Sequence, residues 1–394
     1  MSFPFFQHHE HDESLVLLID VGSASVGSAL VRLNKGQVPH ILATTREAIP
    51  FQETLSSARF LLAMNHTLER VLKLTQTSLK EHGSPKHIFC TLSSPWFVLK
   101  SRDIRIVGTE NFKVTEDILS GFLDKDIERL KEELKETLPP KDTVVIEKKI
   151  IQMKLNGYEI KNPYGQTTAQ MEMTATISLS SKKVIESIER KVGQFFHTES
   201  LHFGSFPVVA FSTIRDIFPE EKNFIFLDIT GEATDVSLVN NDILGGATSF
   251  PRGKNFFIRE ISAHFWTMHE EASSLLSMFL KDTLEGKRRA TVSEIVLRSR
   301  AEWITRLEKA FATLAKVGVV PRTVFFTSDN DVARLFTGLI NAAKSDSLMS
   351  NSFEARYLDD LVVAKFVSFE SEVMRDPFLV VEALLADKLI KNGL

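Results

Sequence analysis

The stretch LVLLIDVGSASVGSALV (Leu15–Val31) decides the predicted fold. It begins with a run of apolar residues typical of a buried strand, reaches Asp20, crosses a turn of small residues and resumes as a second strand. The same order returns in NFIFLDITGEATDVSLV (Asn223–Val239), where Asp228 takes the place of Asp20. In both stretches a Leu-Val pair follows the aspartate at the same spacing. The repeat predicts two related α/β halves, each opening with a β-hairpin.

The chain between the two stretches predicts a separate insert. Apolar residues at three- and four-residue steps predict a helix over 53–82, and a strand follows at His87–Leu92. A helix that begins at Thr115 is ended by Pro139 and Pro140. The remaining elements of this block are strands over 144–155 and 169–179 and a helix over 181–195. We therefore expect a small α+β module inside the first half.

The second half continues as alternating helices and a strand. The expected elements are helices over 256–280 and 291–316, a strand over 323–327, and helices over 331–343 and 377–390. The predicted division of the chain is a flexible tail at 1–14, a first lobe at 15–92, the inserted module at 93–194, a return to the first lobe at 195–222, and a second lobe at 223–394.

The composition is that of an ordinary globular chain. Of its 394 residues, 43% are hydrophobic and 25% are charged, which excludes a disordered or collagen-like chain. The net charge of −4 provides no positive field for nucleic acid or an anionic membrane. A single cysteine, Cys90, excludes an internal disulfide and a thiolate zinc site. No apolar run reaches the ~18–20 residues of a membrane span. These features indicate a soluble, intracellular protein of several domains.

The N-terminal residues offer two weak sites. His8, His9, Glu10, His11 and Asp12 are metal-ligand types, but a mobile polar tail is the better interpretation because no neighbouring fold would fix the ligands. The phenylalanines within Met1–Phe6 are an alternative membrane anchor, but so short a segment buries too little apolar area for stable attachment.

An aspartate at a strand end beside a small-residue turn has a specific chemical use. The turn lets backbone N–H groups approach phosphate oxygens closely. The carboxylate holds Mg²⁺ through water, because Mg²⁺ prefers oxygen ligands and keeps part of its hydration shell. Two such hairpins that face each other would hold a triphosphate between two lobes. The sequence therefore predicts a nucleotide cleft across which Asp20 and Asp228 point toward each other.

These residues resemble the actin-like ATPase superfamily, and within it the branch of the cell-division protein FtsA and the type IV pilus assembly protein PilM. The string from Asn156-Gly157-Tyr158 to Asn162-Pro163-Tyr164-Gly165 resembles the inserted 1C module of FtsA and is the most branch-specific feature. The resemblance runs from about Leu15 to Ile390. It implies an actin-like (ribonuclease H-like) two-lobed α/β fold whose insert is an α+β module of SHS2/1C type.

The resemblance also implies the site residues. It assigns nucleotide contacts to the two hairpins, the turn before the next helix and the adenosine loop: Asp20, Gly22, Ser23, Ser25, Asp228, Thr230, Gly231, Thr234, Gly253 and Ser328. The implied cofactors are ATP and Mg²⁺, with the metal held through water by Asp20 and Asp228. No catalytic residue is identified.

Several positions depart from the family pattern. Glu232 puts a negative charge where the family has a glycine, which is unfavourable unless the side chain points away from the phosphates or meets Mg²⁺. Residues 325–330 lack the glycine pair of the adenosine loop, and Gly204–Pro207 carries no acid or amide to position a water. Loss of a positioned water costs orders of magnitude in rate, whereas backbone donors still bind phosphate. We therefore expect weak binding of ATP with Mg²⁺ and slow or absent hydrolysis, at most a slow ATPase.

The resemblance implies an assembly or scaffold protein at the cytoplasmic face of the membrane, in cell division or type IV pilus assembly. The expected partner is a tubulin-like division polymer or the cytoplasmic tail of a pilus membrane protein, and self-association is left open. Only Lys391–Leu394 follow the last predicted helix, with no counterpart of the membrane-targeting helix of FtsA. This favours a PilM-like role in a cytoplasmic protein that reaches the membrane through its partner.

An active small-molecule kinase or phosphotransferase of the same superfold is the alternative function. It requires a general-base aspartate aimed at the acceptor hydroxyl, and no residue of the sequence matches that pattern. A chaperone-like ATPase would need a peptide-binding domain that the chain has no length to hold. The fold by itself does not decide among these functions.

Overall fold

The computed structural model describes residues 13–197, 200–345, 352–359 and 364–392. The predicted metal-ligand cluster at 8–12 and the anchor at Met1–Phe6 lie outside the described residues, as does nearly all of the predicted tail. Among the helices in the described ranges, none combines the length and the apolar character needed to cross a bilayer.

The first lobe is a six-stranded sheet in the order β15-β3-β2-β1-β4-β9. Its strands are β1 (Glu13–Val21), β2 (Ser25–Asn34), β3 (His40–Ala48), β4 (His87–Leu92), β9 (Leu201–Ser205) and β15 (Ser368–Phe369). β1, β2 and β3 are antiparallel neighbours, and β4 runs parallel to β1. The helices that cover this sheet are α1 (Ser57–His82), α3 (Lys182–Phe195), α4 (Phe206–Ile217) and α10 (Pro377–Lys391). Residues 16–19 of β1 are fully buried, because side chains on both faces of the strand are covered.

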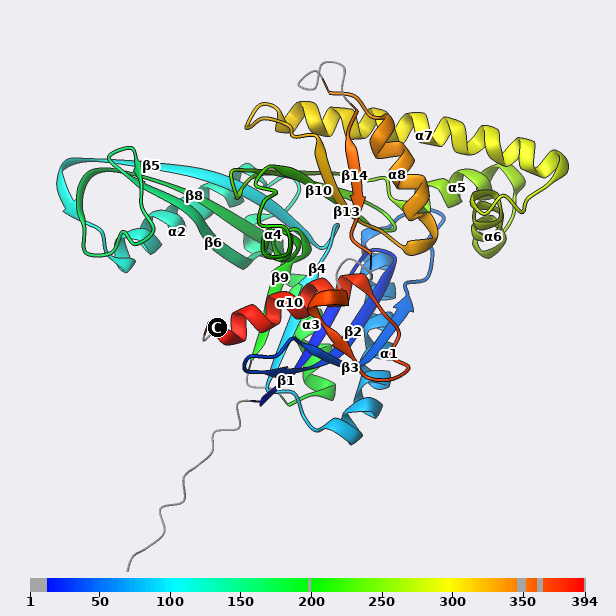
Figure 1. Ribbon diagram of the computed structural model, residues 1–394, viewed down its shortest axis with the longest axis horizontal. Helices are drawn as coiled ribbons and strands as arrows, with labels where there is room; N and C mark the ends of the chain where they lie inside the picture. The colour runs from blue at the N-terminus through cyan, green and yellow to red at the C-terminus, as the bar shows by residue number, and fades with distance from the viewer. Residues whose placement is uncertain (1–12, 198–199, 346–351, 360–363, 393–394) are drawn as a thin grey trace, which may run out of the picture.

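The second lobe repeats this arrangement with a five-stranded sheet in the order β12-β11-β10-β13-β14. Its strands are β10 (Phe224–Ile229), β11 (Thr234–Asn240), β12 (Ile243–Phe250), β13 (Thr323–Thr327) and β14 (Glu354–Tyr357). When the strands of each lobe are numbered in chain order, both sheets contain the same order 3-2-1-4-5. In the first lobe, β15 adds a sixth strand at the edge beside β3. The helices of this lobe are α5 (Lys254–Phe265), α6 (His269–Leu280), α7 (Gly286–Leu314) and α8 (Ala333–Ala342). The predicted pair of related halves is confirmed, and Figure 1 shows the two lobes one above the other.

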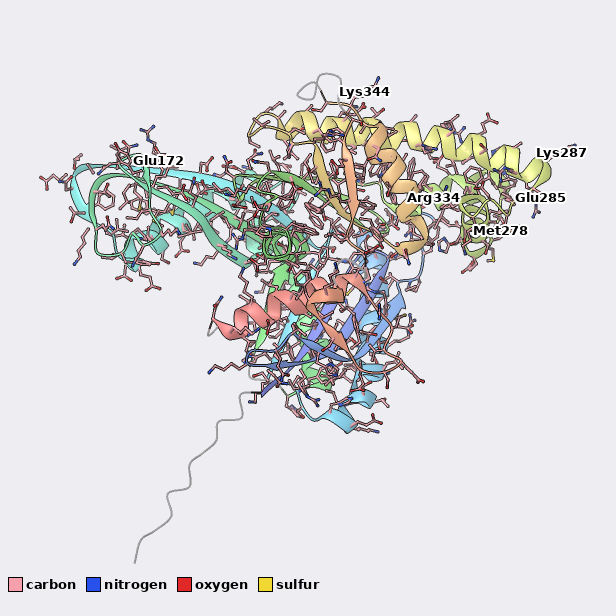
Figure 2. The ribbon with its side chains drawn as sticks, viewed as in Figure 1. Glu172, Met278, Glu285, Lys287, Arg334 and Lys344 are labelled. Atoms are coloured by element: carbon pink, nitrogen blue, oxygen red, sulfur yellow. The ribbon has the colours of Figure 1, made fainter. Side chains whose placement is uncertain are left out.

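The insert is a four-stranded antiparallel sheet in the order β5-β8-β6-β7. It contains β5 (Phe97–Lys113), β6 (Thr143–Leu155), β7 (Tyr158–Glu159), β8 (Thr167–Ser181) and the helix α2 (Glu116–Glu133). Alternate residues of β8 face α2 in a separate apolar core, as their period of two predicts. The module projects to one side of the lobes, so that Glu172 on β8 and Lys287 on α7 lie at opposite ends of the molecule (Figure 2).

Two helices differ from their predicted course. The single helix expected over 256–280 is divided into α5 and α6 because Trp266 adopts a left-handed backbone with φ of 51°, which ends the first helix. The helix α3, predicted to close the insert, packs its apolar stripe against α1 in the core of the first lobe. The domain boundary at 194 stays a proposal.

Candidate functional site

The predicted site residues gather where the two hairpins face each other. The β1–β2 turn of the first lobe and the β10–β11 turn of the second lobe are in direct contact. The Ser23 hydroxyl donates to Thr230 Oγ1 at 2.7 Å and accepts the backbone N–H of Glu232 at 2.8 Å. The first lobe and the second lobe are therefore joined by hydrogen bonds between groups that the resemblance assigns to phosphate binding.

Two glycines show how closely the turns pack. A Cβ atom added at Gly231 would lie 2.6 Å from the Cβ of Ala24 in the opposite hairpin. A Cβ added at Gly253, before α5, would lie 2.0 Å from the carbonyl oxygen of Thr230. Neither distance is compatible with a side chain, so these two positions require glycine for close backbone approach. At Gly231, the two hairpins are too close to admit even a methyl group.

Asp20, at the end of β1, is held by an arginine from β3. The Arg46 Nη2 donates to Asp20 Oδ2 at 2.7 Å, and its Nε donates to Asp376 Oδ2 at 2.5 Å. A third bond runs from Arg46 Nη1 to the Ser25 hydroxyl at 2.8 Å. Asp376 also accepts the backbone N–H groups of Phe378 and Leu379 and so caps α10, which fixes its carboxylate beside the guanidinium. The guanidinium thus holds two carboxylates and the hydroxyl of the predicted phosphate loop.

Burial governs the ionisation of the aspartates at the two hairpins. Loss of hydration raises the pKa of Asp20, and Asp376 adds to this rise while Arg46 opposes it. Burial also raises the pKa of Asp228 well above its ordinary value, with a contribution from Asp235 and a smaller one from Asp20. The pKa of Asp235 is raised to about 6 by burial, although Ser94 donates two hydrogen bonds to it. Asp20 and Asp228 are both buried, so neither carboxylate faces open solvent, and their predicted roles as Mg²⁺ ligands stay predictions.

Glu232, the departure from the family pattern, is paired within the chain. Arg259 of α5 donates to both of its oxygens at 2.7 Å, and Asn255 donates to Oε1 at 2.7 Å. The same guanidinium donates to the carbonyl oxygen of Gln52 in the first lobe at 3.0 and 3.2 Å and lies over the ring of Phe51. Arg259 therefore links the two lobes as well as neutralising a buried acid.

The predicted adenosine side of the cleft is also occupied by internal contacts. Lys254 makes ion pairs with Asp329 and Asp331 at 2.9 Å. The Ser328 hydroxyl donates to the carbonyl oxygen of Asp329, and that of Thr234 donates to the carbonyl oxygen of Arg252. Ser328 and Thr234 are thus placed near the cleft, but their side chains bond within their own lobe.

A triphosphate with Mg²⁺ does not fit between the hairpins as they stand. The Ser23 hydroxyl and the Glu232 N–H, which would face phosphate oxygens, are bonded to each other. The Asp20 carboxylate, which would face the metal, is paired with Arg46. A phosphate group is larger than the methyl group that has no room between Ala24 and Gly231. The predicted contacts to ATP and Mg²⁺ remain predictions, and they apply to a form in which the lobes have separated.

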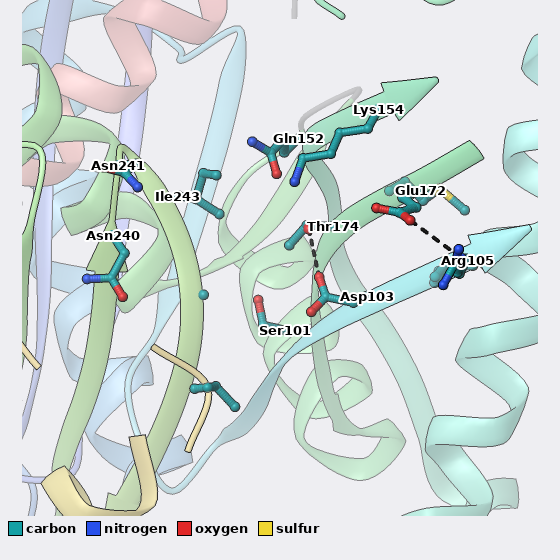
Figure 3. A pocket seen from close by; sticks show the side chains of 14 residues that line it. Ser101, Asp103, Arg105, Gln152, Lys154, Glu172, Thr174, Asn240, Asn241 and Ile243 are labelled. Carbon is teal, nitrogen blue, oxygen red and sulfur yellow. Dashed lines mark hydrogen bonds and ion pairs between the residues drawn. The ribbon is translucent and has the colours of Figure 1, made fainter. Parts of the chain in front are cut away.

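Two cavities of the described residues lie away from the two hairpin turns. A polar groove of about 520 Å³ separates the insert from the second lobe, with Asp103 and Lys154 on one wall and Asn240 on the other (Figure 3). A second cavity of about 190 Å³ lies between the first lobe and the insert. Its walls are mostly apolar side chains from β4, β9 and α10, and two acids, Glu147 of β6 and Glu382 of α10, also line it.

The sequence patterns did not identify Arg46, Arg259 or Gln52 as functional. Their partners are far away in the chain: Asp376 is 330 residues from Arg46, and Gln52 is 207 residues from Arg259. One signal was present, because an acid such as Glu232 inside a buried turn requires a cation nearby.

The comparisons with known proteins support the fold. No protein-family model matches the chain, and no curated protein is detectably similar to it in sequence. Among solved structures, a PilM-PilN type IV pilus biogenesis complex matches with a TM-score of 0.65 at 12% identity, covering 94% of this chain and 98% of that one. The chain therefore has the two-lobed actin-like fold predicted for it, in the arrangement of PilM.

Two other solved structures are less similar. The ethanolamine utilization protein EutJ from Carboxydothermus hydrogenoformans has a TM-score of 0.41 at 9% identity, covering 95% of this chain and 89% of that one. An actin-like ATPase-fold protein from Bacteroides thetaiotaomicron has a TM-score of 0.38 at 12% identity, covering 97% and 99%. These two scores are too low to bear on function.

Proposed function

We propose that this chain is a PilM-like assembly scaffold that works at the cytoplasmic face of the membrane by holding a protein partner. The main support is the likeness to the PilM-PilN complex, which extends over nearly all of both chains and so includes the insert as well as the lobes. A likeness to the lobes alone would be expected of any enzyme with this fold. The scaffold role is also consistent with a cleft whose polar groups are bonded to each other.

The partner that fits this role is the cytoplasmic tail of a pilus membrane protein. We place its docking site in the cavity between the first lobe and the insert. Its walls of Phe89, Phe203, Val209 and Leu385 suit apolar side chains, and it is formed by elements of both the lobe and the insert. The solved neighbour is itself a complex of PilM with a second protein, PilN.

Binding of ATP with Mg²⁺, on this proposal, is weak and is not followed by efficient hydrolysis. A nucleotide would first have to break the Ser23 bonds to Thr230 and Glu232 and displace Arg46 from Asp20. The free energy of opening is subtracted from the free energy of binding, which lowers the apparent affinity. A kinase function finds no support here, because the same contacts leave no space for the phosphate that a kinase would transfer.

The proposal is tested by titrating the chain with the tail peptide of a pilus membrane protein, and in parallel with the tail of a tubulin-like division polymer. The matched variant is Ala386→Phe, which fills the cavity from α10, where Ala386 is buried against it. Asp387→Asn on the same helix is the control. We expect the pilus tail to bind and Ala386→Phe to weaken it at least about tenfold. Binding of the division tail alone, or equal binding by Ala386→Phe, would contradict the proposal.

A further inference from the structure

The groups that Arg46 binds are a set of oxygen ligands. Asp20, Asp376 and Ser25 all direct side-chain oxygens at the guanidinium, and carboxylate and hydroxyl oxygens are the ligands that Mg²⁺ prefers. Gly27 is part of the same arrangement, because a Cβ atom there would lie 2.6 Å from Arg46 Nη2. The β1–β2 hairpin therefore leaves space for an arginine at the place where the fold is expected to hold a metal.

Arg259 of α5 contacts the other hairpin, β10–β11. Its bonds to Glu232 lie at the turn where phosphates are expected, and its bonds to the Gln52 carbonyl reach the opposite lobe. The guanidinium lies over the ring of Phe51 at 4.7 Å, and the same ring stacks on the imidazole of His269 with 3.9 Å between the ring centroids. A segment of the first lobe is thus bound by two elements of the second lobe, α5 and α6.

We propose that two arginines let this fold stay closed without any ligand: Arg46 supplies beside Asp20 the positive charge that Mg²⁺ would bring, and Arg259 bonds the second hairpin to the first lobe. In a cleft that holds Mg²⁺, the positive charge beside Asp20 would come from the metal. Here it comes from Arg46, whose partners all belong to the first lobe. The contacts that cross between the lobes are the Ser23 bonds to the second hairpin, the Ser94 bonds to Asp235 and the Arg259 bonds to Gln52. Closure is therefore constitutive, and nucleotide is not its switch.

The first experiment measures the distance between the lobes. Cysteines introduced at Lys80 on α1 and Lys344 after α8, both exposed, carry spin labels or fluorophores. The native Cys90 is 1% exposed and does not compete for the label. The distance is recorded with and without Mg-ATP for the wild type, Arg259→Met, and the double variant Arg259→Met with Glu232→Gln. The double variant removes both charges, so it does not leave a buried acid unpaired. Arg306→Met, whose partner Glu302 is on the same helix, is the control.

We expect one short distance in the wild type and in Arg306→Met, unchanged by Mg-ATP. Both Arg259 variants should show a population at longer distance. The proposal is overturned by a wild type that is open alone and closes on Mg-ATP, or by a double variant that keeps the short distance. These outcomes are independent of the tail-peptide titration, because the docking cavity lies between the first lobe and the insert and not between the lobes.

A second experiment tests the place assigned to Arg46. The variant Arg46→Ala frees the oxygens of Asp20, Asp376 and Ser25, and it should gain a metal response that the wild type lacks. We expect Mg²⁺ to raise the melting temperature of Arg46→Ala and to leave that of the wild type unchanged, with circular dichroism checking that the variant is folded. A folded variant with no response to Mg²⁺, or a wild type that responds equally, would show that Arg46 does not stand in for a metal.

Discussion

Arg46 is a single cation that faces two buried carboxylates. Its removal would therefore leave two buried acids without a cation, which determines how much stability is lost. The side chain is 19% exposed, whereas those of Asp20 and Asp376 are 3% and 5% exposed. A charge that loses its partner inside a protein cannot be rehydrated cheaply, so breaking one side of a buried pair costs more than the pair itself contributes. Arg46 and Arg259 are therefore the positions at which single substitutions should lower the free energy of unfolding most.

Arg46→Met is expected to lower the free energy of unfolding by about 3–5 kcal/mol, because Asp20 and Asp376 are left buried without a cation. The measurement is urea unfolding near neutral pH. Adding Asp20→Asn to the variant should recover part of the loss, since one of the two unpaired charges is removed. Arg306→Met, at an exposed pair, should cost less than about 1 kcal/mol. Equal losses for the two single variants would contradict the role given to Arg46.

Asp235 predicts a pH dependence. Its pKa of about 6 in the folded chain lies above its ordinary value of 3.8, because burial disfavours the charged form. Between these two values the unfolded chain releases the proton while the folded chain keeps it. The contribution of Asp235 to stability therefore falls as pH rises toward 6 and is constant above it. Asp20, Asp228 and Glu382, whose pKa values are also raised, act in the same direction.

The comparison with Asp235→Asn isolates this effect, because the amide cannot ionise and its oxygen still accepts from Ser94. Relative to the variant, the wild type should lose roughly 2–3 kcal/mol of stability between pH 4 and pH 6, from a shift of about two pKa units. Urea unfolding across this range provides the measurement. Parallel stability curves for the two proteins would mean that Asp235 is ionised in the folded chain at low pH.

The elements that position the site were largely predictable from local sequence. An apolar run, an aspartate and a small-residue turn dictate a buried hairpin, and this pattern identified both β1–β2 and β10–β11. The Asn156-Gly157 turn between β6 and β7 has the positive φ angles that this dipeptide favours. The division of α5 from α6 was not predictable, because tryptophan at Trp266 rarely adopts the left-handed conformation.

The bonds across the cleft were less predictable than the elements themselves. Ser23 is separated from Thr230 by 207 residues, and hydrogen bonds over such distances leave no periodic trace in the sequence. The pattern therefore located the two turns but not the contacts that join them. Only the acid at Glu232 indicated that a cation had to lie nearby.

The start of α5 gives a prediction at the scale of an element. Gly253→Ala would drive a methyl group into the carbonyl oxygen of Thr230, so the helix and the second hairpin would have to separate. We expect a loss of at least about 2 kcal/mol in the free energy of unfolding, because the added methyl group overpacks against the backbone of the hairpin. Gly245→Ala on β12, where a Cβ meets nothing within 4 Å, is the matched control and should be close to neutral. A neutral effect of Gly253→Ala would contradict the close approach described here.

At the scale of the whole molecule, the proposed function assigns different roles to the cleft between the lobes and to the cavity beside the insert. The cleft between the lobes contains paired charges and hydrogen bonds that act within the chain. The cavity between the first lobe and the insert remains available for a partner. A scaffold of this design would present one unchanging surface to its partner, whereas a nucleotide-driven switch would alter that surface with each cycle of binding and release.

The most direct test of this account is a calorimetric titration of the full chain with the pilus tail peptide, performed with and without Mg-ATP. We expect binding of the same affinity in both titrations, because the closed form exists without nucleotide. Binding that appears only with Mg-ATP, or that tightens more than about tenfold in its presence, would contradict it, since the nucleotide would then control the scaffold.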